Sequence, residues 1–202
     1  MPYVMNGMYA KTITAWRNRT MPATADMGAS IQGFLTSKYA VPILILKYAL
    51  EVAPKSYVIH DSQKMMWVLS GNSLIAPPLS RSVKPVTLAL IACRDTEFGD
   101  EKKGNVVYLG IKEKELCLFC AEIQGKPTLQ LKEKNIMDLY TENKAEKPFL
   151  FFHNKEGSTS LFQLVSYPGW FTAPSSTSGQ PIILTQERNK TNNTNFYLYS
   201  VN

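Results

Sequence analysis

The stretch Leu116-Cys-Leu-Phe-Cys-Ala-Glu-Ile-Gln-Gly-Lys-Pro-Thr-Leu-Gln-Leu131 predicts two short strands joined by a tight turn at Gly125. Glycine readily adopts the positive φ that such a turn requires. Gly71 and Gly179 each lie 54 positions from Gly125, and each is also followed by an apolar segment. Since the chain has 11 glycines, the spacing alone is compatible with chance. Together with the flanking strand pattern, it predicts one structural unit used three times.

Short apolar runs alternate with polar, turn-rich segments from Lys55 onward, which is typical of an all-β chain. Only residues 133–143 have a pattern compatible with a helical turn. We predict twelve strands, four in each third: residues 57–61, 66–70, 73–77, 86–92, 105–111, 115–123, 128–132, 149–154, 158–166, 170–173, 181–185 and 195–201. Three four-strand units predict a β-trefoil with pseudo-threefold symmetry, in which a six-stranded barrel is capped by three hairpins. Barrel closure leaves few unpaired strand edges.

The chain divides into two parts of different composition. Residues 1–53 mix polar and apolar residues without a period and contain Pro22 and Pro42, so we expect a poorly ordered leader or propeptide-like extension. Residues 54–202 are expected to form the β-trefoil domain. The formal net charge of +6 divides into +3 for each part. The domain therefore lacks the dense basic stripe of a nucleic-acid binder, and we expect no nucleic-acid partner.

The three cysteines, Cys93, Cys117 and Cys120, are too few for a disulfide framework. Cys117 and Cys120 have C-x-x-C spacing, but they lie on a predicted strand. Side chains three positions apart on a strand point to opposite faces, so the two sulfurs are expected to diverge. A zinc site would also need further ligands, and the chain has only two histidines. We expect reduced, packed cysteines and no metal or cofactor.

Membrane insertion is not expected, because no stretch reaches the roughly 20 apolar residues of a membrane-spanning helix. The apolar run 41–46 is short and lies too deep in the chain for an ordinary secretory signal. We therefore expect synthesis in the cytoplasm without a signal peptide.

Catalytic patterns are scarce. His60 and His153 have no nucleophile at a recognisable spacing, and His60 and Asp61 face opposite ways if they are neighbours on a strand. Neither a nucleophile elbow nor a phosphate-binding loop is present. We do not expect an enzyme.

One segment, Phe162-Gln-Leu-Val-Ser-Tyr-Pro-Gly-Trp-Phe171, resembles the C-terminal signature of the interleukin-1 cytokine family. The signature positions are Phe162, Ser166, Pro168 and Phe171. Other segments resemble the interleukin-36 group within that family: Met66-Trp-Val-Leu-Ser-Gly-Asn-Ser-Leu-Ile-Ala76, Leu90-Ile-Ala-Cys-Arg-Asp-Thr-Glu-Phe98 and Phe149-Leu-Phe-Phe-His-Asn-Lys-Glu-Gly157. The similarity covers about residues 53–202, and the leader resembles nothing in these cytokines.

The resemblance implies a secreted, monomeric, pro-inflammatory signal. Its implied partners are the interleukin-36 receptor and the interleukin-1 receptor accessory protein, which together activate NF-kappa-B and MAPK signalling. A receptor antagonist of the same family is an alternative, because the difference lies in a few loop residues. A heparin-binding trefoil growth factor is a second alternative, but the longest run of basic residues in the domain is Lys102-Lys103.

The family also has an aliphatic-x-Asp motif near the first strand, with cleavage a fixed short distance upstream. Ile59-His-Asp61 fits this motif, which implies cleavage before Leu50. From the residues alone, an ordinary structural role fits equally well: Ile59 as a residue of a barrel strand and Asp61 as a turn former.

Two segments, 97–105 and 187–195, are candidates for receptor contact because they are expected to be exposed and carry mixed charge. The candidate residues are Glu97, Asp100, Lys102, Lys103, Asn105, Arg188, Lys190 and Asn192.

Overall fold

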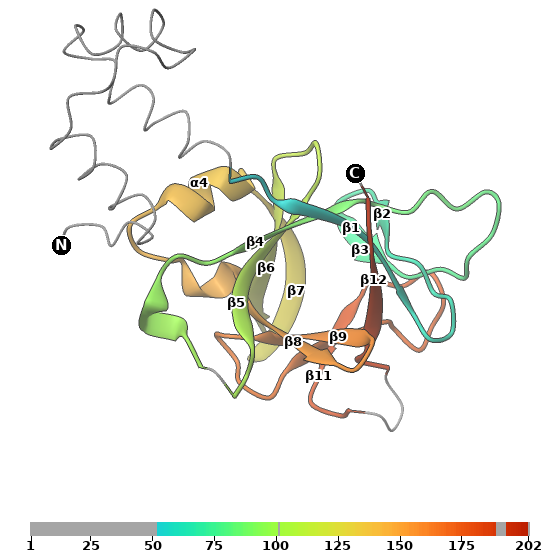
Figure 1. Ribbon diagram of the computed structural model, residues 1–202. Coiled ribbons are helices and arrows are strands. Elements are labelled where there is room, and N and C mark those ends of the chain that lie inside the picture. Colours follow the sequence, from blue (N-terminus) through green and yellow to red (C-terminus); the bar gives the residue numbers. More distant parts are fainter. Residues whose placement is uncertain (1–51, 101, 189–192, 202) are drawn as a thin grey trace, which may run out of the picture. The chain divides into compact units, whose positions relative to one another are not determined.

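Six strands pair edge to edge in a closed antiparallel ring, two from each third of the domain (Figure 1). The computed structural model describes residues 52–100, 102–188 and 193–201. The ring strands are β1 (Lys55–Asp61), β4 (Leu88–Ala92), β5 (Asn105–Ile111), β8 (Leu150–Glu156), β9 (Thr159–Leu164) and β12 (Phe196–Ser200). Each strand pairs with the next in this order, and β12 returns to β1.

Three hairpins complete the twelve strands that the structure describes. They are β2 (Val68–Ser70) with β3 (Ser73–Ile75), β6 (Leu116–Ile123) with β7 (Lys126–Glu133), and β10 (Phe171–Ala173) with β11 (Ile183–Thr185). Gly71, Gly125 and Gly179 lie in the three connections with φ of 57°, 73° and 77°. The first and third hairpins touch, since the Ile182 amide donates to the Leu74 carbonyl at 2.8 Å. The predicted β-trefoil is confirmed.

Two of the predicted strands in the first third of the domain begin two residues later than the sequence suggests. The strand expected at residue 66 begins at Val68, because the Trp67 amide donates to the Ile59 carbonyl at 3.0 Å instead of to a hairpin partner. The strand expected at residue 86 begins at Leu88, since the Val86 amide donates to the Trp67 carbonyl at 2.9 Å. These two bonds attach the first hairpin to the barrel.

The helical prediction was right for one segment and missed two. α4 (Ile136–Thr141) lies within residues 133–143, as expected, and begins where the Asn135 side chain accepts from the Met137 amide at 2.8 Å. Two short 3₁₀ turns, η1 (Thr96–Phe98) and η2 (Lys147–Phe149), were not predicted. A turn of three residues gives no periodic sequence signal.

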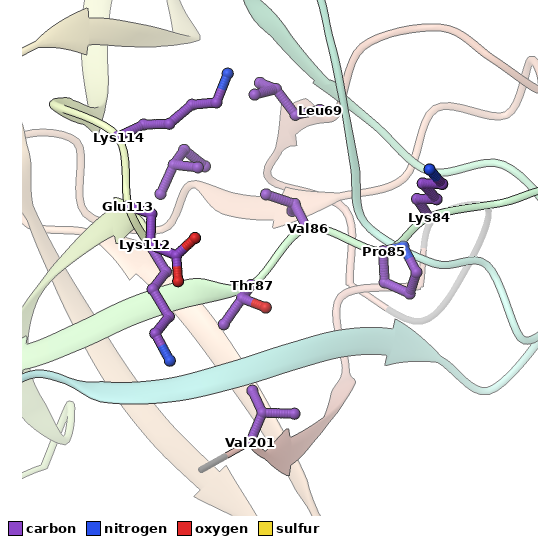
Figure 2. A pocket seen from close by; sticks show the side chains of 10 residues that line it. Leu69, Lys84, Pro85, Val86, Thr87, Lys112, Glu113, Lys114 and Val201 are labelled. Carbon is purple, nitrogen blue, oxygen red and sulfur yellow. The ribbon is translucent and has the colours of Figure 1, made fainter.

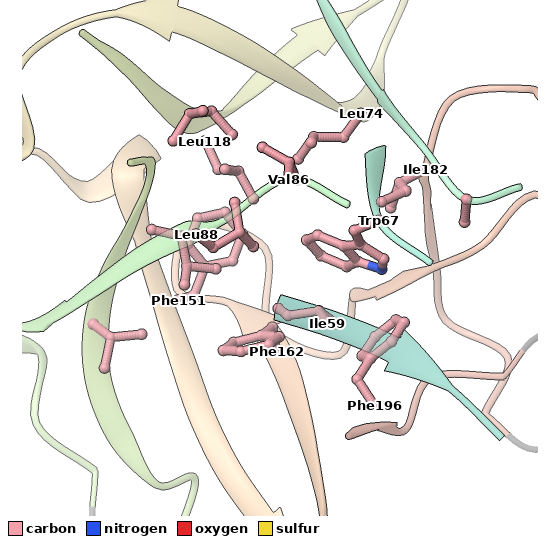
Figure 3. Packing of buried hydrophobic residues seen from close by; sticks show 14 of the residues in the cluster. Ile59, Trp67, Leu74, Val86, Leu88, Leu118, Phe151, Phe162, Ile182 and Phe196 are labelled. Carbon is pink, nitrogen blue, oxygen red and sulfur yellow. The ribbon is translucent and has the colours of Figure 1, made fainter. Parts of the chain in front are cut away.

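The barrel interior is filled by large apolar side chains from all three thirds (Figure 3). Trp67 and Phe196 are fully buried and meet edge to face, with ring centroids 5.2 Å apart. Phe151 and Phe162 are also fully buried. Burial of each such side chain contributes roughly 2 kcal/mol of transfer free energy, so the interior supplies most of the drive to fold.

A second apolar cluster lies outside the barrel, against β4, β5 and β8. Alternation along β5 sends Val107 and Leu109 inward, while Val106 and Tyr108 pack into the outer cluster. Leu139 of α4 belongs to this outer cluster, together with η2. The connection from β7 to β8 therefore covers one outer face of the barrel.

The predicted leader, residues 1–53, falls almost entirely outside the described residues. The barrel belongs to one compact unit, Ala53–Asn202.

Alanine substitutions at two glycines with positive φ separate the cost of backbone strain alone from the added cost of a steric clash. At Gly71, with φ of 57°, nothing lies within 4 Å of an added Cβ, so Gly71→Ala should cost about 1 kcal/mol. At Gly104, with φ of 98°, an added Cβ would lie 2.4 Å from the His153 carbonyl oxygen. Gly104→Ala should cost at least about 2 kcal/mol in urea denaturation. Equal losses for the two variants would contradict the close approach of β5 to β8.

Candidate functional site

The described residues show no arrangement suited to metal binding. No group of three His, Cys, Asp or Glu side chains in residues 52–100, 102–188 and 193–201 could hold a metal ion. Within the same ranges, no helix is long and apolar enough to cross a membrane.

Both histidines are engaged in packing. His60 Nδ1 lies 2.7 Å from the Asp61 carbonyl oxygen, and its ring stacks on Tyr199 at a centroid distance of 5.0 Å. His153 Nε2 lies 2.8 Å from Ser160 Oγ, and its ring stacks on Phe162. Burial lowers the pKa of His153, and nearby Lys155 lowers it further. His153 is therefore held as a neutral ring that supports β8 and β9.

The cysteines are free thiols, as predicted. Cys117 belongs to the outer cluster and Cys120 to the barrel interior, so the two sulfurs diverge as the strand periodicity predicted. Burial raises the pKa of Cys117 to about 12 and also raises that of Cys120. Neither thiol is suited to redox or nucleophilic chemistry near neutral pH.

The Ile59-His-Asp61 motif sits at the end of β1 with two of its side chains buried. Ile59 and Asp61 are each 1% exposed. Asp61 Oδ1 accepts from the amides of Gln63 and Met65 at 2.8 and 2.9 Å, which forms the turn after β1. The motif therefore anchors the first strand: Ile59 holds it in the interior and Asp61 ends it.

The signature residues around the turn from β9 to β10 are mainly structural. Phe162 is fully buried, and Phe171 is 9% exposed. Pro168 precedes Gly169, whose φ of 85° reverses the chain, and the Trp170 amide closes the turn on the Tyr167 carbonyl at 3.1 Å. Ser166 follows the inner strand position Leu164 by two residues and is partly buried.

The first candidate segment, residues 97–105, packs against β8. Asp100 and Lys103 form an ion pair at 3.0 Å, which holds the pKa of Asp100 below its usual range. Lys103 Nζ also lies over the Phe152 ring, 5.5 Å from its centroid. Asn105 pairs with His153 in register. Glu97 and Lys102 are exposed at the surface of this segment.

Two described residues of the second candidate segment, residues 187–195, contact Glu156, the last residue of β8. Arg188 Nη2 donates to both carboxylate oxygens of Glu156 at 2.6 and 2.8 Å, and its guanidinium lies over Phe171. This pairing lowers the pKa of Glu156. Asn195 donates to the same carboxylate at 3.3 Å. Lys190 and Asn192 lie outside the described residues, as does Leu50.

Described residues of both candidate segments thus contact one strand, β8. We call this region the β8 surface and define it by Glu97, Asp100, Lys102, Lys103, Glu156 and Arg188. Its charges are largely paired, and it stands on a barrel strand whose first three residues are buried. A rigid strand that carries polar loops is suited to recognition of another protein.

Sequence reasoning missed an aromatic strip on the outer face of β1 and β12. His60 contacts Tyr197 at a centroid distance of 5.3 Å as well as Tyr199, whose side chain is 55% exposed. His60 and Tyr197 are directly paired across the two strands. The alternation of each strand could have shown that these rings face outward, but not that they meet.

The described geometry is shared with known cytokines. Residues 91–198 match the family model described as Interleukin-1 / 18. The chain is 64% identical over 148 residues to interleukin-36 beta of Mus musculus, covering 73% of this chain and 81% of that one. The segments quoted from the sequence indicate similarity to interleukin-36 beta in particular, and the comparison confirms it.

Similarity to a solved structure extends to the fold. The NMR structure of the pro-inflammatory cytokine interleukin-36alpha aligns with a TM-score of 0.63 and 47% identity, covering 73% of this chain and 94% of that one. The interleukin-36 receptor antagonist protein of Mus musculus is 42% identical over 128 residues, covering 62% of this chain and 79% of that one.

A pair of substitutions at Asp61 tests whether the motif anchors β1. Asp61→Ala leaves the Gln63 and Met65 amides without their acceptor in a buried turn, so it should lower the free energy of unfolding by about 3 kcal/mol. Asp61→Asn keeps one oxygen and should lose about 1 kcal/mol. Urea denaturation measures both. Wild-type stability of the alanine variant would show that Asp61 is not a structural residue.

Proposed function

Because the chain belongs to the interleukin-1 family and is a cytokine of the interleukin-36 type, we propose that it is a secreted receptor agonist with pro-inflammatory activity. It binds the interleukin-36 receptor and then recruits the interleukin-1 receptor accessory protein, which activates NF-kappa-B and MAPK signalling. The observation that carries this proposal is the 64% identity to interleukin-36 beta over 148 residues. The protein acts as a monomer that carries no cofactor and performs no catalysis.

The β8 surface supports this proposal physically. A stable receptor interface needs roughly 800 Å² on each partner, which requires several loops displayed together. Lys103 of the first segment lies over Phe152 and Arg188 of the second pairs with Glu156, which supports one polar face along β8.

The antagonist is the second candidate, because the chain is also similar to the interleukin-36 receptor antagonist protein. The agonist is favoured by the higher identity to interleukin-36 beta and by the described activity of interleukin-36alpha. A heparin-binding growth factor is disfavoured, because two basic side chains of the β8 surface, Lys103 and Arg188, already pair with carboxylates.

A dose–response on epithelial cells with and without the interleukin-36 receptor tests the proposal. We expect an NF-kappa-B reporter to respond only in the receptor-bearing cells. Inhibition of another interleukin-36 agonist without a response of its own would identify an antagonist. Equal responses in both cell lines would contradict receptor-dependent action.

We also propose that proteolytic removal of the leader before Leu50 increases potency. Leu50 lies nine positions before Ile59, and burial of Ile59 and Asp61 fixes β1 relative to the barrel. Val52, the first described residue, is 43% exposed, and cleavage before Leu50 leaves every described residue in place.

Protein that begins at Leu50 should be at least about tenfold more potent than the full chain in the reporter assay, because a long extension would obstruct docking. Protein that begins at Pro54 serves as a control for the exact position of the terminus and should be weaker than the Leu50 form. If the full chain and the Leu50 form signal equally, processing is irrelevant to activity.

Charge reversal on the β8 surface tests its role in receptor binding. Glu97→Lys with Lys102→Glu preserves net charge and changes two exposed side chains, so stability should be unchanged. We expect about tenfold weaker receptor binding in surface plasmon resonance. The control Lys126→Glu with Glu133→Lys, on β7, should bind normally. Normal binding by the β8-surface variant would place the interface elsewhere.

A further inference from the structure

An open groove of about 370 Å³ lies away from the β8 surface, between the approach to β4 and the turn from β5 to β6 (Figure 2). Its floor includes Leu69, Val86 and Ile111, and Val201 extends the apolar lining on one side. Three lysines and one glutamate also line it: Lys84, Lys112, Lys114 and Glu113. We call it the lysine groove.

Backbone hydrogen bonds hold the walls of the lysine groove in place. The Lys112 amide donates to the Thr87 carbonyl at 2.9 Å, which joins the β5–β6 turn to the segment that carries Lys84. The Lys114 amide donates to the Ile111 carbonyl at 3.1 Å and closes the turn. The Val201 amide donates to the Ser56 carbonyl at 3.0 Å. The groove is therefore built before any ligand arrives.

The lysines of the groove are available for a ligand. Within the described residues, none of the three amino groups has a carboxylate within 4.0 Å, whereas Lys103 and Lys134 are both paired. Figure 2 shows Lys114 extending toward Leu69 from one wall and Lys84 standing beyond Val86 on the other. With Glu113, the lining carries a net charge of +2, which is not neutralised by the groove itself.

We propose that the lysine groove binds an acidic peptide segment of a partner protein, with an aliphatic or aromatic side chain of that segment on the apolar floor. The basic rim complements carboxylates, and the floor complements an apolar side chain. A sulfated glycan fits less well, because it offers no apolar group for Leu69, Val86 and Ile111. The site is separate from the β8 surface and extends the protein's recognition to a second kind of contact.

An NMR titration of the ¹⁵N-labelled full chain tests the proposal with defined peptides. The probe is acetyl-Glu-Asp-Leu-Glu-Asp-amide, with a Phe-centred version, an Ala-centred version and a neutral Gln-Asn-Leu-Gln-Asn version. Concentrations up to about 5 mM detect millimolar affinity. We expect the amides of Leu69, Thr87, Lys114 and Val201 to shift with the Leu and Phe peptides. The Ala peptide should bind severalfold more weakly, and the neutral peptide should not bind.

A variant with Lys84, Lys112 and Lys114 all replaced by Gln should bind the Leu peptide about tenfold more weakly. The matched control replaces Lys64, Lys126 and Lys147, which lie outside the groove, by Gln and should bind as wild type. Circular dichroism checks that both variants are folded. Higher salt should weaken binding, because the rim is exposed to solvent.

Three results would overturn the proposal. No shift at the groove amides with any acidic peptide would show that it is not a peptide site. Equal weakening by the control variant would show that net charge alone is responsible. Stronger shifts of the same amides with a heparin hexasaccharide than with the peptides would assign the groove to sulfated glycans.

Discussion

Pairing of β1 with β12 closes the barrel, and both surfaces that we propose for recognition depend on that closure. The two strands come from opposite ends of the domain and pair from Tyr57 with Ser200 to Asp61 with Phe196. Closure encloses Trp67 and Phe196 in the interior and removes two exposed strand edges. Without it, β1 and β12 would each lose a neighbour, and the barrel that supports the loops on β8 would be open.

The outer faces of the pseudo-threefold barrel differ from one another. The connection from β7 to β8 carries α4 and covers the outer face of β4, β5 and β8, where Lys134 binds Glu142 and Glu146 at 2.7 and 3.1 Å. The corresponding outer face at β1 and β12 instead presents His60 and Tyr199. Three similar repeats thus provide one common core, while their differing connections give the barrel distinct outer surfaces.

The repeated hairpins could be predicted from sequence because their determinants are local. Positive φ at Gly125 and the alternation of Val107 and Leu109 both act over a few residues. The late start of β4 could not be predicted, since it depends on a bond from Val86 to Trp67. The candidate site was foreseen as two separate loops. Their meeting on β8 requires the contact of Arg188 with Glu156, which are 32 positions apart.

The lysine groove also depends on contacts between segments that lie far apart in the sequence. Nothing local in the sequence places Lys84 beside Lys112 or puts an apolar floor between them. The groove exists only because the barrel brings the β5–β6 turn to the segment before β4.

Hydrogen exchange of the β1 and β12 amides tests the central claim most directly. If these strands close the barrel, the amides that pair them should exchange as slowly as those between β4 and β5, at rates set by global unfolding. Exchange of the β1 and β12 amides at loop-like rates, while β4 and β5 stay protected, would show an open sheet and contradict the account.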